Sequence, residues 1–260
     1  MNKANFQFSL FKKYNNIVTT SFLEWFVGFT EGDGSFIVNS RGNVTFVVTQ
    51  HSKNKYILNS IRDQLGFGNV IRQGITTNRF VVNKKADIYK LILLFNGNIV
   101  LPSKKKAFSL WVDQYNKMNQ ENVNVLSQDL LPSKENAWLA GFTDAEGCFT
   151  CSLLGNSSSY RYRFLLVQKG IENKVILDSI QSFLGGKVSS MHMKDMYQLT
   201  VNGRKNAKKV MEYFDKYSLQ TTKKKSYDIW KSVHDDLQNK KHMNTFTRDI
   251  LKKKVISINH

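Results

Sequence analysis

The stretch "WFVGFTEGDGSF", residues 25–36, decides the fold because it returns later in the chain as "WLAGFTDAEGCF", residues 138–149. Three further segments recur in the same order and at nearly constant spacing. They are "FVVTQHSKNKYILNSIRDQLG" from Phe46 and "FLLVQKGIENKVILDSIQSFLG" from Phe164, "RFVVN" from Arg79 and "QLTVN" from Gln198, and "SKKKAFSLW" from Ser103 and "TKKKSYDIW" from Thr222. The sequence therefore predicts an internal duplication.

Each copy has the pattern of a helix, two strands, a helix, two strands and further helices. Apolar residues have helical spacing over residues 23–33, and residues 35–40 and 44–50 alternate around an "RGN" turn as a hairpin does. Ser52 is placed to cap a helix that ends at Gly66. The pattern continues with strands at 69–72 and 79–82 and with helices at 84–95 and 103–118. The predicted fold class is α+β, with two pseudo-symmetric repeats and antiparallel sheets.

The same comparison predicts how the chain is divided. We expect an N-terminal extension at residues 1–20, a first repeat at 21–118, a polar linker at 119–134, a second repeat at 135–239 and a basic tail at 240–260. The extension lacks the long apolar core of a signal peptide.

Composition narrows the class of partner. The chain has 260 residues, of which 41% are hydrophobic, and a formal net charge of +18 that divides evenly between its two halves. This charge favours a polyanion such as nucleic acid, although an AT-rich genome also produces lysine-rich proteins. No apolar run is long enough to span a bilayer. The two cysteines, Cys148 and Cys151, should point to opposite faces of a strand, which argues against a shared metal or redox role.

Small residues recur four apart in the two repeated helices. Gly28 and Gly32 share one helix face in the first copy, and Gly141 and Ala145 share it in the second. Small residues at this spacing allow two helix backbones to approach closely. We therefore expect the two repeated helices to pack on each other about a pseudo-twofold axis.

Each repeated helix ends in an acid. Asp33 and Glu146 occupy the last helical positions, where the helix dipole disfavours a carboxylate and a divalent cation would compensate it. One such acid would more often be a solvated helix end, but two copies favour a metal site. Glu31 and Asp144, two residues earlier, point elsewhere and are expected to be solvated or structural.

The motifs "FVGFTEGDG" and "LAGFTDAEG" resemble the signature of the LAGLIDADG homing endonucleases, in the single-chain form that carries two copies. The resemblance implies αββαββα halves whose sheets form a saddle over DNA. It implies that Asp33 and Glu146, with the carbonyls of Gly32 and Ala145, bind the catalytic Mg²⁺. Mn²⁺ could replace that ion, and Ca²⁺ could bind without supporting cleavage.

The resemblance also implies four further catalytic residues. Gln50 and Gln168 correspond to polar residues that hold water near the scissile phosphates. Lys104 and Lys223 correspond to lysines that stabilise negative charge in the transition state. Each of these lysines begins a run of three, and the choice within each run stays open.

Period-two alternation divides the strand residues between two faces. In the first copy Phe36, Val38, Phe46, Val48, Phe80 and Val82 are expected in the core, and in the second copy Phe149, Phe164, Leu166, Leu199 and Val201. The opposite face is then the candidate DNA-binding face. Its residues are Asn39, Arg41, Thr45 and Arg79 in the first copy and Ser152, Arg161, Arg163, Gln198 and Thr200 in the second.

These observations predict a monomeric, site-specific endonuclease that cuts double-stranded DNA at a long asymmetric site. The gene is expected to lie in an intron of an organelle, the mitochondrion before the chloroplast. The alternative is an RNA maturase that uses the same basic surface to help its host intron splice.

Overall fold

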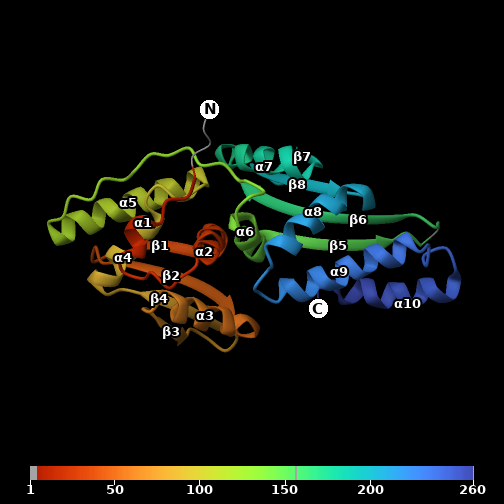
Figure 1. Cartoon of the computed structure of the whole chain (residues 1–260), viewed down its shortest axis with the longest axis horizontal. Helices are drawn as coiled ribbons and strands as arrows, with labels where there is room; N and C mark the ends of the chain where they lie inside the picture. Colours follow the sequence, from red (N-terminus) through yellow and green to blue (C-terminus); the bar gives the residue numbers. More distant parts are fainter. Residues whose placement is uncertain (1–4, 156, 260) are drawn as a thin grey trace. The chain divides into compact units, whose positions relative to one another are not determined.

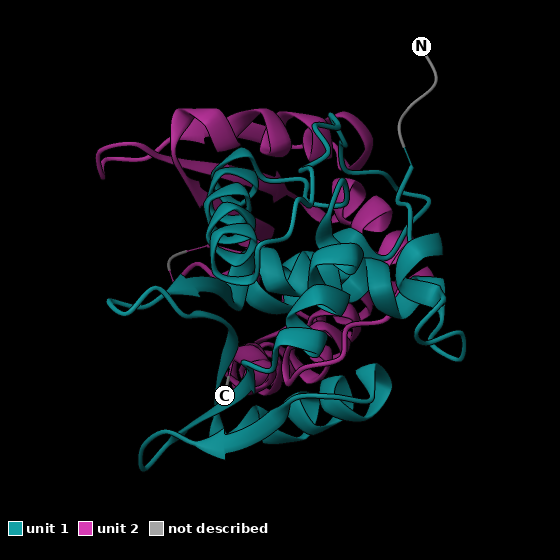
Figure 2. Cartoon of the chain, turned by 90° about the vertical axis from the view of Figure 1, so that its left-hand side faces the viewer, with its two compact units in different colours: residues 1–145 teal, residues 146–260 magenta. Residues whose placement is uncertain are grey.

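The computed structural model of the chain describes residues 5–155 and 157–259 and divides into two compact units, residues 1–145 and 146–260 (Figures 1 and 2). The first signature helix, α2, covers Thr20–Asp33. The second, α6, covers Trp138–Glu146 and lies in the first unit except for its last residue. The first unit therefore contains the crossing of the two signature helices.

The first unit is built on a four-stranded antiparallel sheet of order β1-β2-β4-β3. Its strands are β1 (Gly34–Val38), β2 (Val44–His51), β3 (Asn69–Arg72) and β4 (Thr77–Val82), and its later helices are α3 (Lys55–Leu65), α4 (Lys85–Phe95) and α5 (Pro102–Asn119). Phe46 lies opposite both Phe36 and Val82 in the ladder, so these three side chains share one face. The predicted hairpin of β1 and β2 is confirmed.

Aromatic side chains form the core of the first unit. Phe36 on β1 contacts the rings of Phe46, Phe95, Phe108 and Trp111, with ring centroids 5.3 to 5.6 Å apart. Helices α4 and α5 therefore cover the face of the sheet on which Phe36 lies. Large aromatic rings bury much apolar area for each residue ordered, so this cluster supplies a large share of the hydrophobic stabilisation.

The second unit repeats this plan with a sheet of order β5-β6-β8-β7. The strands are β5 (Gly147–Leu153), β6 (Tyr160–Lys169), β7 (Lys187–Ser190) and β8 (Met196–Asn202), and the helices are α7 (Ile171–Leu184), α8 (Arg204–Lys216), α9 (Lys223–Gln238) and α10 (Thr245–Ile256). Phe149 takes the place of Phe36, because its ring contacts Phe164, Phe214, Tyr227 and Trp230. The predicted α+β fold with two matching halves is confirmed.

The segments outside the two repeats pack against them. Near the N-terminus, helix α1 (Ser9–Lys12) follows the buried Phe8 and itself buries Phe11. Residues 1–4 lie outside the described residues. Residues 121–133 form no helix or strand, yet Leu130 among them is buried. Helix α10 buries Leu251, and the amide of Asn259 donates to the carbonyl of Phe149.

Three local expectations were wrong. Val38 is 43% exposed, because it is the last residue of β1 and borders the turn that follows. Ser52 does not cap α3: it begins a short 3₁₀ turn, η1 (Ser52–Asn54), and its hydroxyl accepts a hydrogen bond from Asn78. Asn39 and Arg41 lie in the turn after β1, so strand alternation does not apply to them.

Within the described residues, no helix combines the length and the apolar character that crossing a membrane requires.

Candidate active site

The outer acid of the first signature, Asp33, is the last residue of α2 and is half-buried. The helix passes directly into β1, because Gly34 has an extended backbone (φ −87°, ψ 154°) instead of a left-handed cap. A Cβ at Gly34 would lie 2.6 Å from the Thr30 methyl group and 2.7 Å from its carbonyl oxygen. The glycine is therefore required for close packing, and the abrupt turn leaves Asp33 at the end of the sheet.

An amide from β2 reaches this acid. Gln50 is buried near the end of β2, and its Nε2 donates to Asp33 Oδ2 at 2.5 Å. Its Oε1 accepts from Nδ2 of Asn54 at 3.1 Å. Asn54 lies in the turn that follows β2, and nothing in the sequence pattern indicated that it would orient Gln50.

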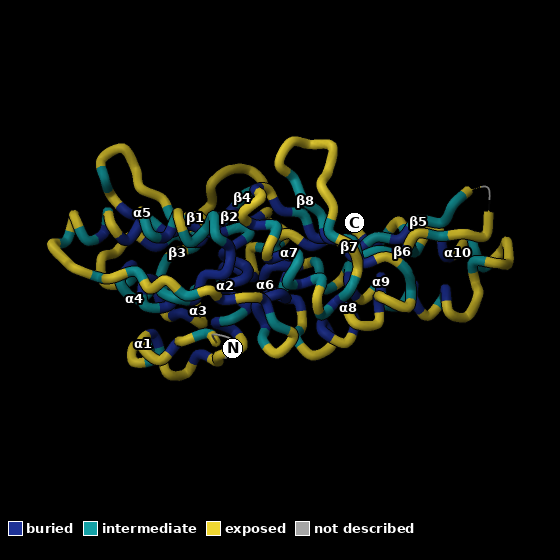
Figure 3. The backbone as a smooth tube through the Cα atoms, turned by 90° about the horizontal axis from the view of Figure 1, so that it is seen from above, coloured by how far each residue is buried: buried dark blue, intermediate teal, exposed yellow. Residues whose placement is uncertain are grey.

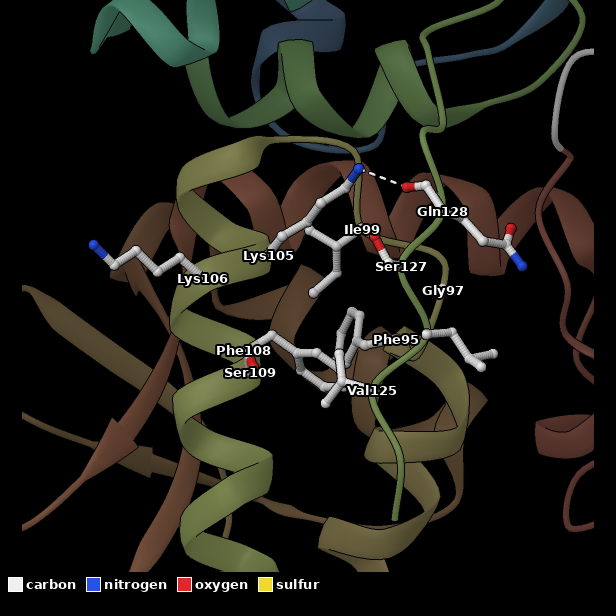
Figure 4. A pocket seen from close by; sticks show the side chains of 11 residues that line it. Phe95, Gly97, Ile99, Lys105, Lys106, Phe108, Ser109, Val125, Ser127 and Gln128 are labelled. Atoms are coloured by element: carbon white, nitrogen blue, oxygen red, sulfur yellow. Dashed lines mark hydrogen bonds between the residues drawn. The ribbon is translucent and has the colours of Figure 1, made fainter.

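The structure separates the three lysines at the start of α5. Nζ of Lys104 donates to the carbonyl oxygen of Gly34 at 2.5 Å, next to Asp33. Nζ of Lys105 instead donates to the carbonyl of Gln128 at 2.6 Å, across a pocket of about 340 Å³, and Lys106 extends away from it (Figure 4). Of the three, Lys104 is the lysine placed beside the outer acid.

The second copy places the equivalent residues by the same sheet register. Gly147 lies opposite Leu166 as Gly34 lies opposite Val48, so Gln168 follows two residues later as Gln50 does. Glu146 is exposed at the end of α6, and Gln168 is buried with its amide donating to the carbonyl of Val167 at 2.8 Å.

The three lysines of the second run also differ in their surroundings. Lys223 is the first residue of α9 and is half-buried. Lys224 pairs with Asp228 one turn later, and Lys225 is exposed. In the repeated motif, Lys223 is the lysine that corresponds to Lys104.

The two signature helices cross at glycines and are largely buried (Figure 3). A Cβ at Gly28 would lie 2.0 Å from the carbonyl oxygen of Trp138, and a Cβ at Gly141 would lie 1.8 Å from that of Trp25. Each glycine thus faces the backbone of the other helix. Gly32 and Ala145 lie one turn later and are both half-buried.

The inner acids are buried across this crossing. Glu31 is 3% exposed and accepts hydrogen bonds from the indole N–H of Trp138 and from the backbone N–H groups of Val100 and Leu101. Asp144 is 4% exposed and accepts from the indole N–H of Trp25 at 2.8 Å. Of the two roles left open for these acids, solvated or structural, the structure supports the structural one.

Burial dominates the electrostatics of Glu31. Loss of hydration raises the pKa of its carboxyl from 4.5 to about 7, against the lowering effect of the Leu101, Val100 and Trp138 hydrogen bonds and of the Lys104 charge. Desolvation penalises the charged form of an acid, and hydrogen bonds to that form offset only part of the penalty.

The sheet faces opposite the helices carry most of the residues predicted to read DNA. Thr49 lies opposite Arg79 in the first sheet, and Arg163 lies opposite both Thr150 and Asn202 in the second. The same face of the second unit holds Ser152, Arg161, Gln198 and Thr200. The Nε atoms of Arg79 and Arg163 are buried and find no hydrogen-bond partner among the described residues.

The two cysteines lie on opposite faces of β5. Cys148 is exposed, and Cys151 is buried, which raises the pKa of its thiol to about 12. A thiol with a raised pKa is a poor nucleophile and a poor metal ligand at neutral pH.

The sequence model of the LAGLIDADG endonucleases matches residues 26–115 and 139–234. These two ranges cover both copies and most of the chain. The chain belongs to the LAGLIDADG endonuclease family.

Individual relatives agree with this assignment. A protein named "Probable intron-encoded endonuclease 4" from Neurospora crassa is 41% identical over 224 residues, covering 84% of this chain and 41% of that protein. The chain thus spans less than half the length of this relative. "Intron-encoded RNA maturase bI4" from Saccharomyces cerevisiae is 30% identical over 159 residues, covering 56% of this chain and 24% of that protein.

The fold is shared with solved members of the family. The LAGLIDADG meganuclease I-AabMI, crystallised bound to uncleaved DNA, superposes with a TM-score of 0.78 at 21% identity, over 91% of this chain and 99% of that one.

The donor set of this LAGLIDADG protein suits a hard divalent cation. Asp33 offers a carboxylate, and Gly32 can offer a backbone carbonyl oxygen at the negative end of α2. Mg²⁺ accepts such partial sets, because it takes one or two carboxylates and completes its shell with water and phosphate oxygens. Across the described parts of the chain, no group of three or more His, Cys, Asp or Glu side chains is arranged to hold a metal.

Proposed function

We propose that this LAGLIDADG protein is a site-specific endonuclease that hydrolyses phosphodiesters of double-stranded DNA with a divalent metal, Mg²⁺ first. One observation carries the proposal: an acid at the end of a signature helix has an amide and an ammonium group beside it. In the repeated motifs of the second copy, an acid, an amide and a lysine recur in the same order, as Glu146, Gln168 and Lys223. Two such acids suit a reaction that must cut two strands.

Different residues of the chain would bind the metal, orient the reacting groups and stabilise negative charge. Asp33 and Glu146, with the carbonyls of Gly32 and Ala145, would hold the metal. When bound, the metal would stabilise the attacking and leaving oxygens of phosphodiester hydrolysis. The Gln50 amide orients the Asp33 carboxylate, and Gln168 is the corresponding residue for water near the second strand. Lys104 and Lys223 would stabilise the charge that develops on the phosphate.

The outward sheet faces would bind the DNA. Arg79 and Arg163 support this proposal most directly, because both lie on the outward sheet faces and a guanidinium group pairs bidentately with a phosphate or a guanine edge. The net charge of +18 adds attraction that does not depend on base sequence. We therefore expect binding to weaken steeply as salt rises.

We propose that the protein acts as a monomer, because one chain carries both copies of the signature. Two relatives are named as intron-encoded proteins, and we propose that this gene also lies in an intron, in the mitochondrion.

The decisive experiment is cleavage by the purified full chain. The substrate is DNA that joins the two exons flanking the gene's intron, and the reactions contain Mg²⁺, Ca²⁺ or a chelator. We expect a double-strand break at one position with Mg²⁺ only. The same DNA with the intron in place is the matched control, and equal cutting of both would contradict a homing function.

The second candidate function is RNA splicing, which is favoured by the similarity to the maturase of S. cerevisiae. A transcript of the host intron, incubated with and without the protein, tests it directly. Faster splicing by an Asp33→Asn variant that no longer cuts DNA would show a separate maturase activity.

A further inference from the structure

The inner acid Glu31 joins three elements that surround the outer acid. It lies on α2, two residues before Asp33, and its carboxylate reaches the start of α5 and the start of α6. We propose that Glu31 is a positioning residue that holds Lys104 beside Asp33. This inference rests on the proposed function and assigns Glu31 a part in it.

Both oxygens of Glu31 are used in this contact. Oε1 accepts from the N–H of Val100 at 2.9 Å, and Oε2 accepts from the N–H of Leu101 at 2.5 Å. Leu101 is the N-cap residue of α5 and has no side-chain cap of its own. A carboxylate at a helix N-terminus is favoured by the helix dipole, so Glu31 anchors α5 from outside the helix.

The anchored segment leads directly to the lysine. Lys104 follows Leu101 by three residues, in the first turn of α5, and that turn is closed by a hydrogen bond from the N–H of Lys105 to the carbonyl of Leu101. From there, Nζ of Lys104 reaches the carbonyl of Gly34. A long lysine side chain loses much rotamer entropy when it is ordered. If the backbone at the start of α5 is already fixed, less further entropy is lost when the ammonium group of Lys104 is placed at the site.

Helix α2 supplies the other half of the geometry. Glu31 and Asp33 are on one continuous helix, so the distance between their Cα atoms is fixed as long as the helix is formed. A single buried carboxylate therefore sets where the ammonium stands relative to the outer acid.

The third hydrogen bond connects this arrangement to the second copy. Nε1 of Trp138 donates to Oε1 of Glu31 at 2.9 Å, and Trp138 is the first residue of α6. Because its oxygens already accept three hydrogen bonds inside the protein, Glu31 is a support for the site instead of a ligand in it.

The test combines Glu31→Gln, Lys104→Ala and the double variant in the full chain. The glutamine keeps the size of the side chain but turns an N–H₂ group toward a backbone donor. Cleavage of pre-bound DNA is measured at pH 8 in Mg²⁺, and binding is measured in Ca²⁺. We expect Glu31→Gln to slow cleavage about tenfold and Lys104→Ala about 100-fold, with little change in binding. The double variant should be no slower than Lys104→Ala, because one residue acts through the other.

A second readout does not depend on cleavage. In the protein without DNA or metal, amide hydrogen exchange of residues 100–105 should become about tenfold faster in Glu31→Gln, because the start of α5 has lost an anchor. Glu24→Gln is the matched control: Glu24 is on the same helix and accepts the N–H of Ala137 at 3.0 Å, at the start of α6 instead of α5. We expect this control to leave cleavage and exchange at residues 100–105 unchanged.

The outcomes separate the inference from the proposed function. Rate losses that multiply in the double variant, or unchanged exchange at residues 100–105, would overturn the role of Glu31. A wild-type protein that cuts no DNA would overturn the proposed function, and the exchange experiment would still decide whether Glu31 anchors α5. If Glu31→Gln does not fold, Glu31→Asp replaces it in every experiment, and an intermediate effect is expected because two oxygens remain.

Discussion

Two acids of each signature, only two residues apart, have opposite surroundings. Glu31 is 3% exposed and is held by an indole and two backbone N–H groups, whereas Asp33 stands half-buried at the end of the same helix. The second copy repeats the contrast, with Asp144 buried against Trp25 and Glu146 exposed. The inner acids join the two signature helices, whereas the outer acids lie at the ends of those helices.

Helix geometry explains why this contrast is so sharp. Residues two apart on an α-helix point to different sides, so one acid of each pair faces the neighbouring signature helix and the other faces the end of the sheet. The inner acid can be buried only because tryptophan and backbone donors satisfy it. Substitutions at the outer acids and at the helix crossing therefore test the exposed and the buried surroundings separately.

The largest effect is expected from the outer acids. Asp33→Asn or Glu146→Gln removes a charge that we propose to bind the metal, and we expect double-strand cleavage to fall by about 1000-fold while DNA binding stays within about threefold. The melting temperature should be unchanged or slightly higher, because a carboxylate at a helix C-terminus is unfavourable. Cleavage assays and thermal melting of the same samples measure both. Cleavage that survives either change would contradict the role given to the outer acids.

The glycines at the crossing of α2 and α6 test the close packing that buries the inner acids. Gly28→Ala places a methyl group 2.0 Å from the carbonyl oxygen of Trp138, so the helices must move apart and the free energy of unfolding should fall by at least about 3 kcal/mol. Urea unfolding measures this change. Gly74→Ala is the control, because a Cβ there meets nothing within 4 Å. Equal stability of the two variants would show that the crossing is looser than the structure indicates.

The raised pKa of Glu31 predicts how stability depends on pH. The folded state binds the proton more tightly than the unfolded state, so the contribution of this group is full below pH 4.5 and is lost as pH rises to about 7. In metal-free protein, the loss should be about 3 kcal/mol for this fully buried group. Urea unfolding at pH 5 and pH 8 should therefore show a smaller pH dependence in Glu31→Gln. A slope identical to that of the wild type would argue that Glu31 ionises normally.

The smallest effect is expected at the residues that orient the outer acid. Gln50→Ala leaves Asp33 without its amide donor, and we expect cleavage to slow about tenfold. Asn54→Ala removes the hydrogen bond that Asn54 donates to Gln50 and should cost about threefold. Single-turnover cleavage compares the two variants. A larger loss for Asn54→Ala than for Gln50→Ala would reverse this order and assign Asn54 a direct role.

Much of this organisation could be read from the sequence. The repeated order of motifs predicted the two halves, and alternation placed Phe46, Phe80 and Val82 in the core, where they are almost fully buried. Alternation was wrong for Val38, because it predicts the face on which a side chain lies and not how much of that side chain is covered. The positions of Gln50 and Lys104 beside Asp33 came from resemblance, and no periodicity of the chain would have located them.

The sequence by itself determined which residues repeat, and hence the two-half fold, the glycines at the helix crossing and the outer acids at the helix ends. Such features are local, since they depend on spacing along one helix or strand. Only the tertiary structure decided that Glu31 is buried and that Lys104, not Lys105, stands beside Asp33. Those contacts join residues about 70 positions apart, and the packing of helices on the sheet, not spacing along the chain, selects them.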